Sequence, residues 1–307
     1  MFLTLLAVLV LLPLLTGCDR FIKDNPPLVF CSPDAPRMRR AVQGLEAALG
    51  QGPLEAVFVS VSGEGAETEL RRLRQRRPRL LLVLGTAALM QAAPVEKRIP
   101  MVFGVVANPY FTGAAWDPKD PWFHLENATG IASPAPLAAA LNQGAALLGK
   151  GPWGLLYDPN DGVAVEIKER FLKEAPDAGI QPLIEASASA GEDRSGLELL
   201  LTRGAKVIYL PPAPGAARYA DLLLAWGREL KVKVVSGHPE ILHKGALLRV
   251  TLDYYRLGEE IGALARRVLQ GEKPAQIPII ESTPIKVEVD ESLLRQWMGY
   301  PATGGAY

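Results

Sequence analysis

Short apolar runs alternate with amphipathic helices along most of this chain, and this alternation limits the possible folds more than any other feature of the sequence. Runs such as Leu80–Leu84 and Val207–Leu210 contain no charged residue. Strands that are apolar on both faces are typical of parallel sheets covered on both sides by helices. The pattern therefore predicts an α/β protein built on parallel sheets.

The apolar runs and the helical periodicity between them define the expected elements. We expect strands at Leu28–Cys31, Ala56–Val61, Leu80–Leu84, Met101–Ala107, Trp153–Tyr157, Gln181–Ala186, Val207–Leu210, Val232–Ser236, Ala246–Thr251, Ile277–Ile280 and Ile285–Val289. We expect helices at Arg37–Leu49, Glu67–Arg76, Leu137–Leu148, Val163–Ala175, Leu197–Thr202, Tyr219–Leu230 and Tyr254–Leu269, with a closing helix near the end.

An irregular segment, Asn108–Gly130, separates two blocks of this pattern. A long segment of this kind inside a compact chain is usually a domain crossing or a functional loop. The similar blocks on either side predict two lobes that face a cleft, and we read Asn127–Thr129 within the segment as a turn. Several aromatic residues either line that cleft or pack at the crossing: Tyr110, Phe111, Trp116 and Trp122.

The first residues of the chain predict export and a lipid anchor. Phe2–Leu15 is almost wholly apolar but shorter than the roughly 20 residues of a membrane-spanning helix, which is typical of a signal peptide. The following Leu15-Thr16-Gly17-Cys18 string resembles the lipobox of bacterial lipoproteins. We therefore expect a signal peptide at 1–17, acylation of Cys18 and a polar tether at 18–27, with the protein anchored to the cell membrane and facing the periplasm or the extracellular side.

Charge and cysteine content narrow the set of partners. The 33 Lys and Arg residues balance 33 Asp and Glu residues, so no overall field favours nucleic acid, and we expect no nucleic-acid partner. A run of arginines lies on a predicted helix whose buried side is Leu70 and Leu73: Arg71, Arg72, Arg74, Arg76, Arg77 and Arg79. They form either a solvated basic face or a docking patch for a membrane partner. With Cys18 acylated, Cys31 is expected to be a buried thiol at a strand end.

The sequence contains no convincing catalytic, metal or cofactor motif. Gly144–Gly151 has the spacing of a phosphate-binding loop, but it follows a helix and ends in Gly151 where that loop needs Ser or Thr, so we read Gly149 and Gly151 as helix-stop residues. There is no Gly-x-Ser-x-Gly elbow, and His124, His238 and His243 do not have the spacing of a ligand set. We expect no enzyme activity, no metal and no cofactor.

The polar residues that follow the predicted strands are the candidates for ligand binding. In open α/β sheets, ligands bind outside the carboxyl ends of the strands. Thr86 also precedes a helix, so its hydroxyl and the following amides could accept a carboxylate. Ser32, Thr86 and Asn160 could equally cap helices, and Asp253 reads as a helix cap rather than a ligand contact. The candidates are Ser32, Thr86, Ala87, Asn108, Tyr157, Asp158, Asn160, Asp161, Ser236 and His238.

Taken in order, several strings resemble the ABC-transporter substrate-binding family that includes tryptophan and tyrosine transport components. They are Pro78–Thr86, Ile99–Phe103, Asn127–Gly130, Leu156–Pro159, Asp253–Gly258 and Leu269–Pro274. The resemblance implies a type I periplasmic-binding-protein fold, in which two Rossmann-like lobes are joined by a three-crossing hinge and close around a solute. We place lobe 1 at 28–128 plus 240–272 and lobe 2 at 129–239 plus 273–307.

The resemblance also implies a function: capture of a small solute, such as an amino acid or an aromatic compound, and its delivery to an ABC permease and its ATPase, with one chain sufficient. The loop that holds Thr86 matches the family and would bind a ligand carboxylate. The chain departs from the family where Asn108 replaces an aspartate, and where Pro211–Pro214 lacks an acid. Asp158 or Asp161 could then face an α-ammonium group. The alternatives are a ligand-sensing subunit of a signalling system and, less favoured, a lipoprotein enzyme.

Overall fold

The computed structural model describes residues 25–32, 35–50, 54–58, 65–239 and 245–298, so the expected signal peptide, Cys18 and most of the tether lie outside the described residues. The chain divides into two compact units, the first from 1–132 and 258–281 and the second from 133–257 and 282–307. It passes from one unit to the other three times, after Ala132, Leu257 and Glu281. Each unit is an α/β structure with its own sheet, as predicted.

The sheet of the first unit contains six parallel strands in the order β11-β5-β4-β3-β1-β2. Its strands are β1 (Leu28–Cys31), β2 (Ala56–Phe58), β3 (Leu81–Leu84), β4 (Met101–Val106), β5 (Ala128–Ala132) and β11 (Ile280–Glu281). β1 and β3 are fully buried, which explains why both are continuous apolar runs. Cys31 is buried at the end of β1, as expected.

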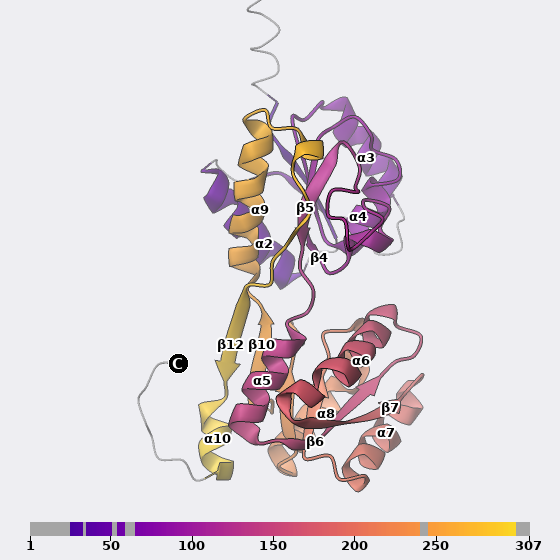
Figure 1. The fold of residues 1–307 in the computed structure, drawn as a ribbon, viewed down its shortest axis with the longest axis vertical. Coiled ribbons are helices and arrows are strands. Elements are labelled where there is room, and N and C mark those ends of the chain that lie inside the picture. Colours follow the sequence, from indigo (N-terminus) through magenta and orange to yellow (C-terminus); the bar gives the residue numbers. More distant parts are fainter. Residues whose placement is uncertain (1–24, 33–34, 51–53, 59–64, 240–244, 299–307) are drawn as a thin grey trace, which may run out of the picture. The chain divides into compact units, whose positions relative to one another are not determined.

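Helices cover both faces of this sheet (Figure 1). They are α2 (Pro36–Leu49), α3 (Ala66–Gln75), α4 (Thr86–Ala92) and the larger part of α9 (Tyr254–Leu269), with the short 3-10 turns η1 (Pro109–Phe111) and η4 (Pro274–Gln276). α9 lies directly against α2, because a Cβ atom on Gly258 would be only 2.0 Å from the carbonyl oxygen of Ala41. Leu70 and Leu73 are the buried side of α3, as its pattern predicts.

The second unit has a six-stranded sheet in the order β12-β10-β9-β8-β6-β7. All neighbours are parallel except β12, which pairs antiparallel with β10 at the sheet edge. The strands are β6 (Gly151–Tyr157), β7 (Ile180–Ala186), β8 (Val207–Leu210), β9 (Lys233–Ser236), β10 (Leu248–Leu252) and β12 (Ile285–Val289). Fully buried Trp153 and Tyr209 lie in the core beneath one face.

Two groups of helices pack on opposite faces of the second sheet. α5 (Leu137–Leu148), α6 (Gly162–Glu174) and α10 (Glu291–Met298) share one core, and α7 (Ala190–Thr202) and α8 (Ala217–Glu229) share the other. The 3-10 turns η2 (Pro176–Ala178) and η3 (Pro214–Ala216) complete the unit. Gly149 ends α5 with a φ of +97°, so the loop that resembled a phosphate site is a helix stop followed by a strand.

The reading of Asn127–Thr129 as a turn holds for Asn127 and is wrong for the other two residues, because Ala128–Ala132 forms the buried strand β5. Its small residues let neighbours approach closely: a Cβ atom on Gly130 would lie 2.4 Å from Phe103. The Thr129 hydroxyl donates to the carbonyl of Ile277, 2.9 Å away. These tertiary contacts outweigh the low strand propensity of alanine and glycine.

The expected lobe boundaries also differ from the units. Residues 129–132 belong to the first unit, because β5 pairs with β4. β10 belongs to the second unit rather than to lobe 1, because it pairs with β9 and β12. β11 belongs to the first unit rather than to lobe 2, because Ile280 pairs with Ile131. Among the described residues, no helix has the length and hydropathy to span a membrane.

Candidate functional site

The carboxyl ends of β1, β3 and β4 are adjacent in the first sheet, and they carry four of the predicted residues. Ser32 follows β1, Thr86 and Ala87 follow β3, and Asn108 lies just beyond β4. Because these strands are neighbours and parallel, the four residues lie along one edge of one sheet. The structure thus gathers the predicted residues of this unit at the edge where α/β sheets bind ligands.

A contact between two strands shapes the start of α4. Gly85 has a φ of +95°, and a Cβ atom there would lie 2.2 Å from the Ser32 hydroxyl oxygen. The missing side chain lets Ser32 approach the helix and accept a hydrogen bond from the Ala88 amide at 3.2 Å. Ser32 is buried and acts as the helix cap that Gly85 cannot supply. Of the two roles open to Ser32, this contact supports the cap.

At the start of α4, the polar groups of Thr86 and Ala87 remain available to bind a ligand. Thr86 is exposed and Ala87 is half-buried. Within the described part of the chain, no hydrogen bond occupies the Thr86 hydroxyl or the amide of either residue. A hydroxyl and two backbone amides that point from one turn form a set of donors suited to a carboxylate.

β4 contains a strained bulge near its carboxyl end. Val105 has a φ of +57°, a region that β-branched residues avoid, and the β4–β5 register shifts between Phe103 and Val106. The bulge leads to Asn108, whose side-chain oxygen accepts from the Tyr110 amide at 3.1 Å. Asn108 therefore fixes the entry to η1, and its side-chain amide hydrogens remain as donors.

The second sheet presents its own group of predicted residues after β6. Tyr157 is the last residue of the strand and lies beneath Lys168, whose ammonium nitrogen is 5.6 Å from the ring centroid. Asp161 caps α6 by accepting from the Val163 amide at 2.9 Å, and its other oxygen accepts from the Gly215 amide at 2.9 Å. Both Asp161 oxygens thus hold protein groups in place. Asn160 is exposed.

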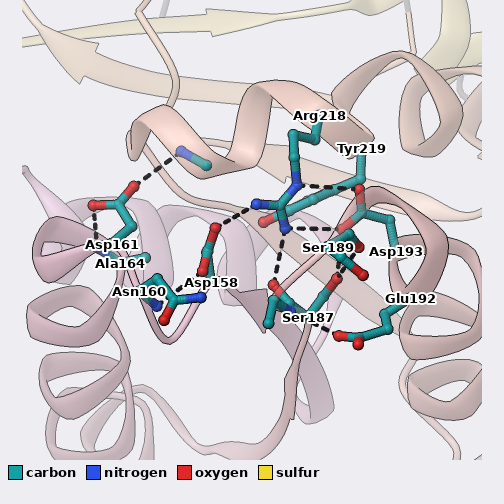
Figure 2. A network of polar contacts seen from close by, with 12 residues as sticks. Asp158, Asn160, Asp161, Ala164, Ser187, Ser189, Glu192, Asp193, Arg218 and Tyr219 are labelled. Carbon is teal, nitrogen blue, oxygen red and sulfur yellow. Dashed lines mark hydrogen bonds and ion pairs between the residues drawn. The ribbon is translucent and has the colours of Figure 1, made fainter.

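Asp158 belongs to a network, centred on Arg218, that the sequence did not predict (Figure 2). One of the Asp158 oxygens accepts from the Asn160 amide at 2.9 Å, and the other pairs with the guanidinium of Arg218 in α8. Arg218 also pairs with Asp193 of α7 at 3.2 Å and donates to the Ser187 carbonyl at 2.8 Å. We call Asp158, Ser187, Asp193 and Arg218 the arginine brace. It ties the ends of β6 and β7 to two helices.

Burial and charge define the electrostatics of the arginine brace. The Asp158 and Asp193 side chains are 10% and 5% exposed, and Arg218 is 28% exposed. Hydrogen bonds from the Asn160 amide and from Arg218 hold the pKa of Asp158 below its usual range. Hydrogen bonds to Asp193 and Asp158 raise the pKa of Arg218. The Ser187 hydroxyl donates to Asp193 at 2.6 Å, so the buried carboxylate has several donors.

Two local signals could have identified the arginine brace. Asp193 lies on the helical stripe of Leu197 and Leu200, where an acid needs a buried partner. Arg218 is the second residue of α8, where the helix dipole disfavours a cation unless an acid is near. Neither signal names the partner, because Arg218 and Asp158 are 60 residues apart in the sequence.

The structure also places the remaining predicted residues, which are Ser236, His238, Asp253 and the aromatic residues of the irregular segment. Ser236 ends β9, is fully buried and accepts from the amide of nearly buried His238 at 3.2 Å. Asp253 caps α9 by accepting from the Tyr255 amide at 3.1 Å, as predicted. Phe111, Trp116 and Trp122 are 82%, 49% and 57% exposed. Trp116 nevertheless contacts Phe123, with ring centroids 4.9 Å apart, and half-buried Tyr110 packs against the core of the first unit.

Comparison with known proteins identifies a family that matches this chain and solved structures that share its fold. The family model for ABC transporter substrate binding proteins matches residues 34–297. A tyrosine-binding protein of Clostridioides difficile (strain R20291) is 21% identical over 217 residues, which cover 70% of this chain and 62% of that protein. The match thus spans less than two thirds of the relative's length.

Two solved structures share the fold. A ligand-free, open substrate-binding protein with adhesive properties from Clostridium difficile has a TM-score of 0.76 at 17% identity, over 91% of this chain and 96% of that one. An ABC domain from Streptococcus pneumoniae in complex with L-Trp has a TM-score of 0.69 at 21% identity, over 90% and 95% of the two chains.

Proposed function

This chain belongs to the family of ABC transporter substrate-binding proteins, and from that premise we propose that it captures an aromatic amino acid outside the cell and delivers it to an ABC permease. The family supports import rather than ligand sensing by a signalling subunit, and binding rather than chemistry. The relative named for tyrosine and the structural neighbour with L-Trp support an aromatic ligand. The lipid anchor on Cys18 is part of the proposal, and would hold the protein at the outer face of the cell membrane.

The observation that carries the proposal is the set of uncommitted donors at the carboxyl edge of the first sheet. The Thr86 hydroxyl and the amides of Thr86 and Ala87 have no acceptor among the described residues, whereas Ser32 is already bound to Ala88. An α-carboxylate would accept from these donors through charge-assisted hydrogen bonds. We therefore assign Thr86 and Ala87 to carboxylate binding and Ser32 to the support of their turn.

The acids of the second unit have a different role in this proposal. Asp158 and Asp161 accept from protein donors, so neither is a free partner for an α-ammonium group. We assign both to positioning of the β6 edge. Exposed Asn160, half-buried Tyr157 and nearly buried His238 are then the groups of that edge that can contact a solute.

Calorimetric titration of the chain lacking residues 1–24 tests the proposal. The panel contains L-tryptophan, L-tyrosine and L-phenylalanine, with tryptamine as the carboxyl-free analogue and indole-3-propionate as the amine-free one. We expect an aromatic amino acid to bind and tryptamine to bind worst, since the carboxylate contacts are assigned to uncommitted donors. No binding across the three amino acids would refute the ligand class.

Thr86→Val tests the assigned contact. Loss of one charge-assisted hydrogen bond costs about 1.5–3 kcal/mol, so affinity should fall roughly tenfold to a hundredfold. The matched control is Thr202→Val, the same change at an exposed threonine at the end of α7, which should leave affinity unchanged. Equal affinity of the Thr86 variant and the unmodified chain would remove Thr86 from the site.

A further inference from the structure

A basic cavity lies in the first unit at the end of the sheet opposite to the donors of Thr86. It has a volume of about 620 Å³ and is lined by residues that precede β3 and β4 and by the end of α3. This volume is within the range of small-molecule sites. The binding of solute does not use this end of the sheet, so the cavity needs a separate explanation.

One wall of the cavity is held rigidly by Glu96. This carboxylate is 2% exposed and pairs with Arg74 at 2.7 Å, and it accepts from the amides of Arg98 and Ile99 at 2.7 and 2.9 Å. The Asn127 side chain donates to the carbonyl oxygens of Glu96 and Ile99. The loop is therefore organised before any ligand arrives. The single acid of the lining is already neutralised within the protein.

The remaining charges of the lining are positive. Arg74, Arg77, Lys97 and Arg98 against Glu96 give four cations and one anion, a net charge of three positive units. Arg77 and Arg98 are exposed, and neither guanidinium forms an ion pair with any residue in the described part of the chain. Guanidinium groups present planar pairs of donors that match the oxygens of a phosphate group.

The rim of the cavity is also where the amino-terminal segment meets the unit. The Asn25 side chain donates to the Arg77 carbonyl at 2.9 Å, and the Arg79 guanidinium donates to the Asn25 carbonyl at 3.1 Å. Cys18 precedes Asn25 by seven residues, and seven residues span at most about 25 Å in any conformation. An acyl group on Cys18 would therefore keep Asn25, which is hydrogen-bonded to Arg77, within about 25 Å of the membrane surface.

We propose that this cavity binds the phosphate headgroup of an anionic phospholipid in the membrane that carries the anchor. Arg77 and Arg98 would pair with the phosphate, Lys97 would add attraction, and half-buried Ile99 would contact the glycerol backbone. Basic pockets and clusters of this kind bind anionic headgroups. The inference rests on the proposed anchor for its location, while the charge and shape of the cavity stand independently of the solute. Arg77, which follows α3, thus gives one part of the arginine-rich 71–79 segment a role in docking to the membrane.

The test is co-sedimentation of the chain lacking residues 1–24 with vesicles of phosphatidylcholine, with and without about one third phosphatidylglycerol. We expect binding only to the anionic vesicles, and its loss at about 1 M salt. The Arg77→Gln/Arg98→Gln double variant should lower the partition coefficient about tenfold or more. The control is Arg71→Gln/Arg72→Gln, which removes the same charge from exposed arginines paired with Glu67 and Glu69, and should change binding less than about twofold.

Three results would overturn the proposal. They are no binding to anionic vesicles, equal loss in the two double variants, and protection against thermal unfolding by inorganic phosphate without any vesicle binding. The last result would identify a free anion rather than a lipid as the occupant. Calorimetric titration of the Arg77/Arg98 variant with an aromatic amino acid separates this inference from the proposed function. Retained solute affinity with lost vesicle binding supports the headgroup site, whereas vesicle binding without any solute affinity would refute only the proposed function.

Discussion

Replacing Arg218 with glutamine removes the one cation of the arginine brace and leaves its two acids in place. Asp158 and Asp193 are 10% and 5% exposed at their side chains, so water cannot readily replace the guanidinium. Removing one partner of a buried ion pair costs about 3–5 kcal/mol. Because Arg218 itself is 28% exposed, we expect the lower end, about 3 kcal/mol of lost stability in the second unit at pH 7.

The pH dependence of this effect has a defined sign. The lowered pKa of folded Asp158 means that its carboxylate stabilises the fold fully above its unfolded pKa of about 3.9. That contribution is lost as the pH falls through the folded pKa, because the acid then takes up a proton. The difference between the unmodified chain and Arg218→Gln should therefore be constant near neutral pH and shrink below about pH 4.

Amide hydrogen exchange measured peptide by peptide is the appropriate assay, because the two units need not unfold together. A loss of about 3 kcal/mol corresponds to exchange roughly 150-fold faster in the most protected amides of β6 and β8. Peptides from β3 and β4 serve as the internal control and should not change. Arg295→Gln is the matched variant, since it breaks an exposed pair with Glu291 in the same unit and should cost less than about 1 kcal/mol.

The double variant Arg218→Gln/Asp193→Asn completes the test. Neutralising both members removes the uncompensated buried charge, so it should be more stable than Arg218→Gln alone. The reasoning is refuted if Arg218→Gln costs no more than Arg295→Gln, or if the double variant is the less stable of the two.

Three further changes test other contacts. Gly85→Ala adds a Cβ atom 2.2 Å from the Ser32 hydroxyl oxygen at a φ of +95°. It should lower the free energy of unfolding of the first unit by about 2–4 kcal/mol and weaken solute binding. An unchanged melting temperature would contradict the close contact. Gly258→Ala places a Cβ atom 2.0 Å from a backbone oxygen of α2 and should cost about 2 kcal/mol or more, as urea unfolding would measure. Burial opposes the charge of Glu96, but hydrogen bonds from Arg74 and the loop amides outweigh it and lower its pKa. Glu96→Gln should then destabilise the first unit above about pH 4.5 and lose its effect as the pH falls through the lowered pKa; an effect that persists at low pH would contradict this origin.

The alternation of apolar strands and amphipathic helices was sufficient to predict the architecture, because burial on both faces leaves a strong local pattern. β1, β3 and β8 follow continuous apolar runs, and each is buried along its length. β5 lacks that pattern because its sequence, Ala128-Thr129-Gly130-Ile131-Ala132, is selected for close approach to Phe103 rather than for apolar area. The lobe boundaries were wrong where they depended on strand pairing, since β10 and β11 pair with partners far away in the sequence.

The candidate site could likewise be predicted only in part. Strand ends could be located from the sequence, so Thr86, Asn108 and Asp158 were all identified as edge residues. The roles of these residues could not be predicted, because a hydroxyl or carboxylate that caps a helix has the same sequence context as one that binds a solute. Ser32 illustrates the difficulty, because its hydrogen-bond partner, Ala88, is 56 residues away in the sequence. Ala88 lies in the first turn of α4, and the N-cap residue of that helix, Gly85, has no side chain that could cap it. Only the three-dimensional contact separates the two roles.

The arginine brace changes how substitutions of Asp158 must be interpreted. An acid at the end of a strand is an obvious partner for an α-ammonium group, and loss of binding in Asp158→Asn would ordinarily be taken as evidence for that contact. Here the same substitution weakens a pair with Arg218 and thereby disturbs Asp193 and the end of β7. Arg218 is a cation, so it cannot attract an ammonium group. If Arg218→Gln weakens solute binding as much as Asp158→Asn does, the acid acts by positioning the β6 edge, and recognition of the amine must come from other groups.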